Sequence, residues 1–307
     1  MRVAAVDCGT NTVKLLVADL DRASGKEVEL VRESRMVRLG QGIDRTGELA
    51  EDALARLFAA VDEFARLVGD HDVEAVRFCA TSAARDARNA ELFMSGVEQR
   101  LGVRPEIIAG AEEARLSFAG ATRGLGDEQP PILVVDIGGG STELVLGVRH
   151  GEVEAGFSLD IGSVRLTERH LHTDPPTSDE LAAAAADVDA ALDLLPAQGI
   201  ALERTATAVA VSGTGLTVAA AVLDLPALDR HALHGAVVPV AGVHAAVERL
   251  LAMTVAERRE LPFMHPGRAD VIGAGALILD RVLARCQVTE LRVSVSDILD
   301  GIAWSLT

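Results

Sequence analysis

One short pattern occurs twice in this chain and constrains its fold more than any other feature. Each copy is an apolar run that ends in aspartate, then a glycine turn with small hydroxyl residues, then a second apolar run. Residues 3–17 read VAAVDCGTNTVKLLV, and residues 132–146 read ILVVDIGGGSTELVL. Apolar, β-rich runs on both sides of a short glycine turn predict strand–turn–strand hairpins. The repeat therefore predicts two similar halves with a cleft between them.

The turn residues predict a phosphate-binding site. Glycine allows close approach of the backbone to a ligand, and successive backbone N–H groups can hold phosphate oxygens. Aspartates at strand ends, here Asp7 and Asp136, can hold a hard cation such as Mg²⁺. The alternatives are that these aspartates only cap their own turns and that the triple glycine is only a tight turn. The candidate phosphate-binding residues of the turns are Gly9, Thr10, Asn11, Thr12, Gly138, Gly139, Gly140, Ser141 and Thr142.

Two common nucleotide-binding motifs do not fit these turns. A dinucleotide-binding turn leads into a helix, whereas residues 143–148 continue as an apolar strand. A Walker loop requires a lysine and a hydroxyl residue after its last glycine, and neither turn has this order. We therefore expect a mixed-sheet fold in which the ligand is clamped between two hairpins.

Composition limits the partners and the compartment. The formal net charge of −17 over 307 residues argues against a nucleic-acid surface, so an anionic substrate must rely on local cations and metal. Three cysteines are typical of a reducing compartment, and together with the early Asp7 they predict a cytoplasmic protein without a signal peptide. Residues 205–223 carry no charge, but a buried strand, a tight turn and a helix explain them better than a membrane span.

The remaining pattern divides the chain into two α/β regions. Each half reads as three strands, a helix, a strand and a helix, with antiparallel first strands and parallel later ones. One helix is expected over residues 83–101, and capping boxes are expected at Thr177 and Thr254. Residues 124–131, rich in glycine and proline, are the strongest candidate for a linker between the two regions. We expect a first domain over residues 1–123 with a closing helix at about 296–307, and a second domain over residues 124–295.

Several segments in collinear order resemble the exopolyphosphatase/guanosine pentaphosphate phosphatase (Ppx/GppA) family of the actin/hexokinase/acetate-kinase superfamily. The resemblance implies a two-domain actin-like (ribonuclease H-like) ATPase fold with duplicated mixed sheets, helices and an interdomain cleft. It covers nearly the whole chain. The matching segments are residues 7–12, 80–89, 110–116, 136–143, 162–168, 212–215 and 266–270.

The resemblance also implies roles for individual residues. It places the family's catalytic glutamate at Glu113, the second of two adjacent carboxylates, of which only one can face a cleft squarely. Glu143 resembles a family carboxylate of the metal site or phosphate loop. Lys14, Arg85 and Arg268 are candidates for binding phosphate. The alternative for each basic residue is a surface ion pair, and that for Glu143 is a solvated strand residue.

The expected activity is that of a Mg²⁺-dependent (or Mn²⁺-dependent) exopolyphosphatase that releases orthophosphate from the end of polyphosphate. The acidic composition favours short polyphosphate chains as substrates. The expected lack of the C-terminal helical domain of longer relatives favours them too. The first alternative is hydrolysis of pppGpp to ppGpp by the same residues. A phosphotransferase and a non-catalytic sensor of polyphosphate or (p)ppGpp are further alternatives. The family resemblance also makes a homodimer plausible.

Overall fold

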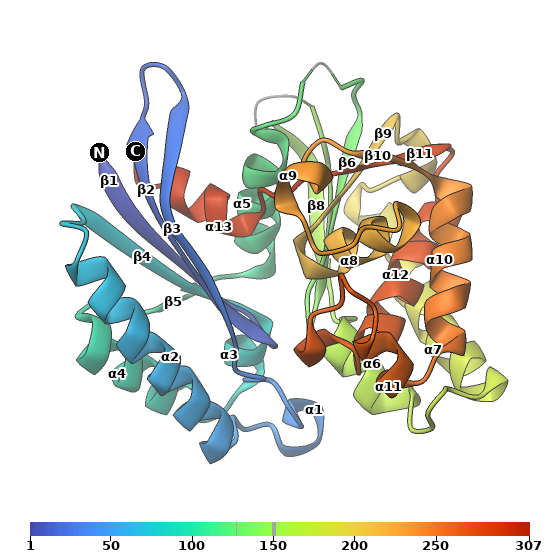
Figure 1. Ribbon diagram of the computed structural model, residues 1–307, viewed down its shortest axis with the longest axis horizontal. Helices are drawn as coiled ribbons and strands as arrows, with labels where there is room; N and C mark the ends of the chain where they lie inside the picture. The colour runs from blue at the N-terminus through green and yellow to red at the C-terminus, as the bar shows by residue number, and fades with distance from the viewer. Residues whose placement is uncertain (127, 149–151) are drawn as a thin grey trace.

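The computed structural model describes residues 1–126, 128–148 and 152–307, and it contains two mixed β-sheets with helices around them (Figure 1). The first sheet has the strand order β3-β2-β1-β4-β5. Its first three strands are antiparallel, and β4 and β5 run parallel to β1. The elements of this half are β1 (Arg2–Cys8), β2 (Thr12–Asp21), β3 (Lys26–Met36), α1 (Ile43–Thr46), α2 (Glu51–Gly69), β4 (Ala75–Ala80), α3 (Ser82–Asp86), α4 (Ala90–Leu101), β5 (Glu106–Ile107) and α5 (Gly110–Thr122).

The second sheet repeats this arrangement with the strand order β10-β11-β9-β6-β7-β8. The hairpin strands are antiparallel, and β6, β9 and β11 are parallel. The strands are β6 (Ile132–Ile137), β7 (Thr142–Gly147), β8 (Val153–Leu159), β9 (Thr207–Val211), β10 (Val237–Pro239) and β11 (Glu290–Val293). The helices are α6 (Ser163–His170), α7 (Ser178–Leu192), α8 (Ser212–Val222), α9 (Arg230–Leu233), α10 (Val240–Ala252), α11 (Val255–Arg259), α12 (Ile272–Arg285) and α13 (Ile298–Trp304), with 3₁₀ turns at Leu195–Gln198, Leu202–Arg204 and Pro266–Arg268.

Two helices that lie between the sheets connect the halves (Figure 1). Helix α5 packs Ala114, Phe118 and Ala121 against the second sheet, although it precedes that sheet in the sequence. Helix α13, at the end of the chain, packs against the first sheet. The predicted domain boundary at residues 123/124 therefore follows α5, a helix that packs against the second sheet. The division of the chain into two domains at this boundary stays a prediction.

The structure confirms most of the predicted elements. Both hairpins, their third strands and the mixed sheets are present, and Thr177 and Thr254 both form complete capping boxes. The prediction of a single helix over residues 83–101 is wrong, because residues 87–89 separate α3 from α4. The cause is tertiary: the Asn89 side chain pairs with both backbone groups of Leu49 and holds the loop before α2.

Some segments fall outside the predictions. Helix α6, strand β10 and helix α10 were not anticipated.

The predicted linker contains neither helix nor strand in its described part, and its Asp127 lies outside the described residues. Across the described chain, no helix is long and apolar enough to span a membrane.

Candidate active site

The two predicted glycine turns have the same geometry. In the first turn the amide of Gly9 donates to the carbonyl oxygen of Thr12 over 2.9 Å, and in the second the amide of Gly138 donates to that of Ser141 over 2.9 Å. Asp7 and Asp136 lie at equivalent positions, each at the end of its strand. The duplication seen in the sequence is therefore a duplication of backbone structure.

The two turns are packed against each other. A Cβ atom on Gly139 would lie 3.0 Å from Cβ of Thr10, and one on Gly140 would lie 2.4 Å from Oγ1 of Thr10. Only glycine fits this close approach. Oγ1 of Thr10 is buried and has no hydrogen-bond partner among the residues that the structure describes. A buried polar atom without a partner in such a turn suits a ligand that supplies one.

A pocket opens where the turns meet, and we call it the hairpin pocket. The predicted site residues that line it are Asp7, Gly9, Thr10, Asn11, Thr12, Lys14, Glu113, Asp136, Gly138, Gly139, Gly140, Ser141, Glu143 and Arg268. Thr142 and Arg85 are the predicted residues that do not line it. The Thr142 hydroxyl is buried and donates to the carbonyl oxygen of Ile161 over 2.7 Å, so it holds the neighbouring backbone.

Four buried carboxyl groups give the hairpin pocket an excess of negative charge. Burial raises the pKa of Asp7 to about 7, although the nearby Lys14 opposes the shift. Burial also raises the pKa of Asp136, and it raises that of Glu113 against the opposing charge of Arg85. The pKa of Glu143 rises well above its usual value because of burial and the charges of Glu113 and Asp136. A bound cation would relieve this repulsion.

Serine hydroxyls hold two of these carboxyl groups in place. The Ser117 hydroxyl donates to Oδ2 of Asp136 over 2.6 Å, and the Ser158 hydroxyl donates to Oε1 of Glu143 over 2.7 Å. Ser117 lies one helical turn beyond Glu113, so both residues point from the same face of α5. Neither serine was singled out in the sequence, because a single hydroxyl has no motif of its own.

The adjacent glutamates of α5 have different environments. Glu113 is 6% exposed and accepts a hydrogen bond of 2.6 Å from Nη1 of Arg85. Glu112 points away and forms an ion pair of 2.6 Å with Arg77. Only Glu113 lines the hairpin pocket, as the helical geometry predicts. Arg85 does not line the hairpin pocket; besides Glu113, it donates to the carbonyl oxygen of Ile108 at 2.9 Å, and its predicted phosphate binding stays a prediction.

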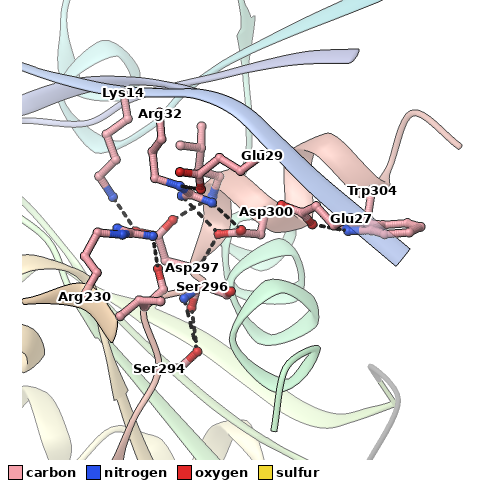
Figure 2. A network of polar contacts seen from close by, with 12 residues as sticks. Lys14, Glu27, Glu29, Arg32, Arg230, Ser294, Ser296, Asp297, Asp300 and Trp304 are labelled. Atoms are coloured by element: carbon pink, nitrogen blue, oxygen red, sulfur yellow. Dashed lines mark hydrogen bonds and ion pairs between the residues drawn. The ribbon is translucent and has the colours of Figure 1, made fainter. Parts of the chain in front are cut away.

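Lys14 lies beside the carboxyl groups and is held by a residue that the sequence analysis did not identify. Its Nζ lies 2.7 Å from Oδ2 of Asp297 and 3.6 Å from Oδ2 of Asp7. Figure 2 shows this contact, with Lys14 pointing toward Asp297 just before α13. Although burial acts in the opposite direction, Lys14 and Arg32 lower the pKa of Asp297 to about 2. Asp297 is distant in sequence from both hairpins, so only the fold shows its role.

Arg268 reaches the pocket from the second half. Its guanidinium lies across Gly213, where a Cβ atom would approach Nη1 to 1.3 Å. Among the described residues it has no ion-pair partner, and burial lowers its pKa. Ser212 has φ of 58°, which a non-glycine residue rarely adopts, and it lines the pocket beside Gly213. Such backbone strain commonly occurs at functional sites.

The donor set fits a hard divalent cation. All four pocket carboxyl groups offer oxygen ligands, which Mg²⁺ and Mn²⁺ prefer. Within the described residues, no group of three or more histidine, cysteine or acidic side chains is close enough to form a complete metal site. Mg²⁺ usually takes only one or two protein carboxylates and completes its shell with water and substrate phosphate, so this arrangement is compatible with it.

Comparisons with known proteins agree with this geometry. The model of the Ppx/GppA phosphatase family matches residues 20–306. Exopolyphosphatase 2 of Mycobacterium tuberculosis is 46% identical over 99% of this chain and 98% of its own length. The crystal structure of an exopolyphosphatase-like protein superposes with a TM-score of 0.95 at 42% identity, covering 100% of this chain and 98% of that one.

A more distant structure has the same fold. The Aquifex aeolicus member of the Ppx/GppA family superposes with a TM-score of 0.84 at 30% identity, over 100% of this chain and 97% of that one. The two duplicated mixed sheets thus form the actin-like fold that we expected. The chain belongs to the Ppx/GppA phosphatase family.

Proposed function

We propose that this protein is an exopolyphosphatase, which hydrolyses the terminal phosphoanhydride bond of inorganic polyphosphate and releases orthophosphate. The observation that carries the proposal is that Asp7, Asp136, Glu113 and both glycine turns line one pocket. The names of its mycobacterial and structural relatives support the same activity. Their similarity extends over the full chain, so the proposal does not rest on a shared fragment.

Glu113 is proposed as the general base. Phosphoryl transfer to water needs a positioned water molecule and a group that accepts its proton. Glu113 has its carboxyl group in the pocket and is oriented by Arg85, which also favours the ionised form that a base requires. After attack, the P–O bond to the rest of the chain breaks and the shortened chain leaves as the anion.

The turns and basic residues are proposed to hold the phosphates. Residues 9–12 and 138–141 line the pocket, and the turn amides other than those of Gly9 and Gly138, which donate within their own turns, can donate to phosphate oxygens. The Thr10 hydroxyl, which has no partner among the described residues, can do the same. Lys14 and Arg268 supply positive charge on two sides of the pocket. Mg²⁺ or Mn²⁺, held by Asp7 and Asp136 with Glu143 beside them, would offset the charge that develops on the transferred phosphoryl group.

The alternative substrate is pppGpp, since the same residues would hydrolyse its terminal phosphate. A phosphotransferase would use the same cleft with a nucleotide acceptor, and a non-catalytic sensor would bind the same anions without turnover. Further proposals that follow from the family are a homodimer, a cytoplasmic location and no nucleic-acid or membrane partner. The net charge of −17 supports the exclusion of nucleic acid.

The test is a phosphate-release assay with Mg²⁺ and polyphosphate of several lengths, with pppGpp in parallel, each with and without ADP. An exopolyphosphatase releases orthophosphate from polyphosphate without ADP and turns over polyphosphate with a higher kcat/KM than pppGpp. Preferential turnover of pppGpp would establish the alternative substrate. ATP formation that depends on ADP would establish a phosphotransferase, and binding without any product would establish a sensor.

A further inference from the structure

A second cavity, which we call the side cavity, adjoins the hairpin pocket. It has a volume of about 370 Å³ and lies between β3, the start of α8, α9 and the loop before α13. Thr12, Lys14, Ser212, Gly213 and Arg268 line both cavities, so the two share the boundary that these residues form. A ligand whose end lies in the hairpin pocket therefore has the side cavity directly beside it.

Most charged groups of the side cavity are already paired. Arg32 contacts Glu29 and Asp300 at 2.6 Å each, and Lys14 contacts Asp297 at 2.7 Å. Glu33 is paired with Arg35 at 2.6 Å. The acidic and basic residues of this wall thus largely neutralise one another.

Arg230 is an exception. It is the first residue of α9, and the only hydrogen bond of its side chain to a described residue is from Nη2 to the carbonyl oxygen of Val295 at 3.2 Å. No described carboxylate lies within ion-pair distance of it. Burial and the charge of Arg32 lower its pKa, and the more distant charges of Asp297, Glu29 and Asp300 oppose this shift. Figure 2 shows its guanidinium directed toward the region of Asp297.

Arg268 also has no ion-pair partner in the described part of the chain, and it lies where the two cavities meet. The adjacent His265 does not add charge, because burial and Arg268 lower its pKa and its Nδ1 accepts from the amide of Gly267. Two half-buried guanidinium groups that meet no carboxylate at ion-pair distance among residues 1–126, 128–148 and 152–307 are costly in the absence of a ligand. In a chain of net charge −17, they mark a local site for an anion.

We propose that the side cavity is a subsite for the part of the phosphate chain behind the reacting phosphate, and that Arg230 makes the affinity depend on chain length. The proposal rests on the proposed function, since it assumes that the reacting end lies beside Glu113. Arg268 contacts the chain where the cavities meet, and Arg230, which lines only the side cavity, contacts phosphates farther along. Tripolyphosphate is too short to use this contact as fully as a longer chain does.

The test compares Arg230→Gln with Arg249→Gln as a matched control. Arg249 likewise donates one hydrogen bond to a backbone carbonyl, that of Ala221 at 3.0 Å, but it lines neither cavity. For Arg230→Gln, we expect KM for long-chain polyphosphate to rise about tenfold and KM for tripolyphosphate to rise much less. The control should keep the wild-type ratio of the two KM values.

An equal rise in KM for both lengths, or no change for long chains, would overturn the proposal. An effect on pppGpp without one on long polyphosphate would also overturn it, since the side cavity would then be a nucleoside site. Titration calorimetry with long-chain polyphosphate separates this proposal from the proposed activity. If wild-type protein releases no phosphate but still binds long chains more tightly than Arg230→Gln does, the subsite stands and the activity fails. If phosphate is released and the KM ratio is unchanged, only the subsite fails.

Discussion

Arg85 donates from Nη1 to Oε2 of Glu113 over 2.6 Å, and the same nitrogen donates to the carbonyl oxygen of Ile108 at 2.9 Å. The Ile108 carbonyl fixes the guanidinium, and the guanidinium in turn fixes the carboxylate that faces the pocket. We therefore infer that Arg85 orients the proposed base, and its role as a direct phosphate ligand stays a prediction. This changes what its removal should do.

Replacing Glu113 with glutamine should remove turnover and leave binding. The amide has nearly the same size but cannot accept the proton of the attacking water, so we expect kcat to fall by at least ~10²-fold. Phosphate release measures kcat, and calorimetry with tripolyphosphate measures binding. The neighbouring Glu112→Gln is the matched control, because Glu112 pairs with Arg77 away from the pocket and should keep wild-type kcat. Wild-type turnover in Glu113→Gln would remove Glu113 from the proposed mechanism.

Replacing Arg85 with glutamine should alter the pH dependence of the reaction. Burial raises the pKa of Glu113, and Arg85 opposes this shift, so loss of Arg85 raises the pKa further. A base must be ionised to act, so the acidic limb of the kcat profile should move to higher pH. The measurement is kcat against pH for wild type and variant. A higher KM with an unchanged acidic limb would instead identify Arg85 as a phosphate ligand, which is what the sequence alone predicts.

Replacing Asp7 with asparagine should stabilise the metal-free protein and abolish activity. The folded-state pKa of Asp7 is about 7, above the value near 3.8 of an unperturbed aspartate, so the ionised form disfavours folding. This penalty is complete above pH 7 and disappears as the pH falls toward 4. At pH 8 with EDTA, the variant should therefore gain on the order of 1–3 kcal/mol in the free energy of unfolding.

Thermal unfolding at pH 8 and at pH 5 measures this effect of Asp7. The gain should be large at pH 8 and small at pH 5, because wild-type Asp7 is then mostly protonated. Asp52→Asn provides the control: Asp52 is exposed, and a hydrogen bond from Arg56 lowers its pKa, so the variant should gain no stability at pH 8. A less stable Asp7→Asn protein at pH 8 in EDTA would contradict the account of charge repulsion in the pocket.

The parts of the site that local pattern predicts are the two hairpins and the acidic and glycine residues within them. Strand, turn and aspartate are contiguous in the sequence, and their repetition predicts that they meet. The same reasoning selects Glu113 over Glu112, because adjacent helical residues point in different directions. The contact between Arg85 and Glu113 could not be predicted in this way, because the matching segment identifies a loop but not the direction of a side chain.

What the pattern could not predict depends on contacts between distant segments. Asp297 neutralises Lys14 from the other end of the chain. Only the fold shows that the Arg230 guanidinium lies against the Val295 carbonyl and near Arg32, with no ion-pair partner among the described residues. The break between α3 and α4 likewise comes from the tertiary pairing of Asn89 with Leu49. Helical periodicity is a local property and contains no information about such partners.

The crossing of α5 and α13 depends on two glycines, and Gly120 offers the clearest test. A Cβ atom on Gly120 would lie 1.9 Å from the carbonyl oxygen of Asp297, and one on Gly301 would lie 2.0 Å from that of Leu116. The obstructing atoms are backbone, so the helices must separate to admit a methyl group. We expect Gly120→Ala to lower the free energy of unfolding by about 2 kcal/mol or more.

Gly69→Ala is the matched control for this substitution. Gly69 ends α2, and nothing lies within 4 Å of where its Cβ would be. Alanine favours helix, so the control should raise stability by about 0.5–1 kcal/mol. Denaturant unfolding of both variants gives the comparison. Because α5 carries Glu113 and Asp297 lies at the start of α13, Gly120→Ala should also lower kcat at temperatures where it stays folded. If Gly120→Ala kept wild-type stability, close contact of the two helix backbones would not be what joins the two halves of the molecule.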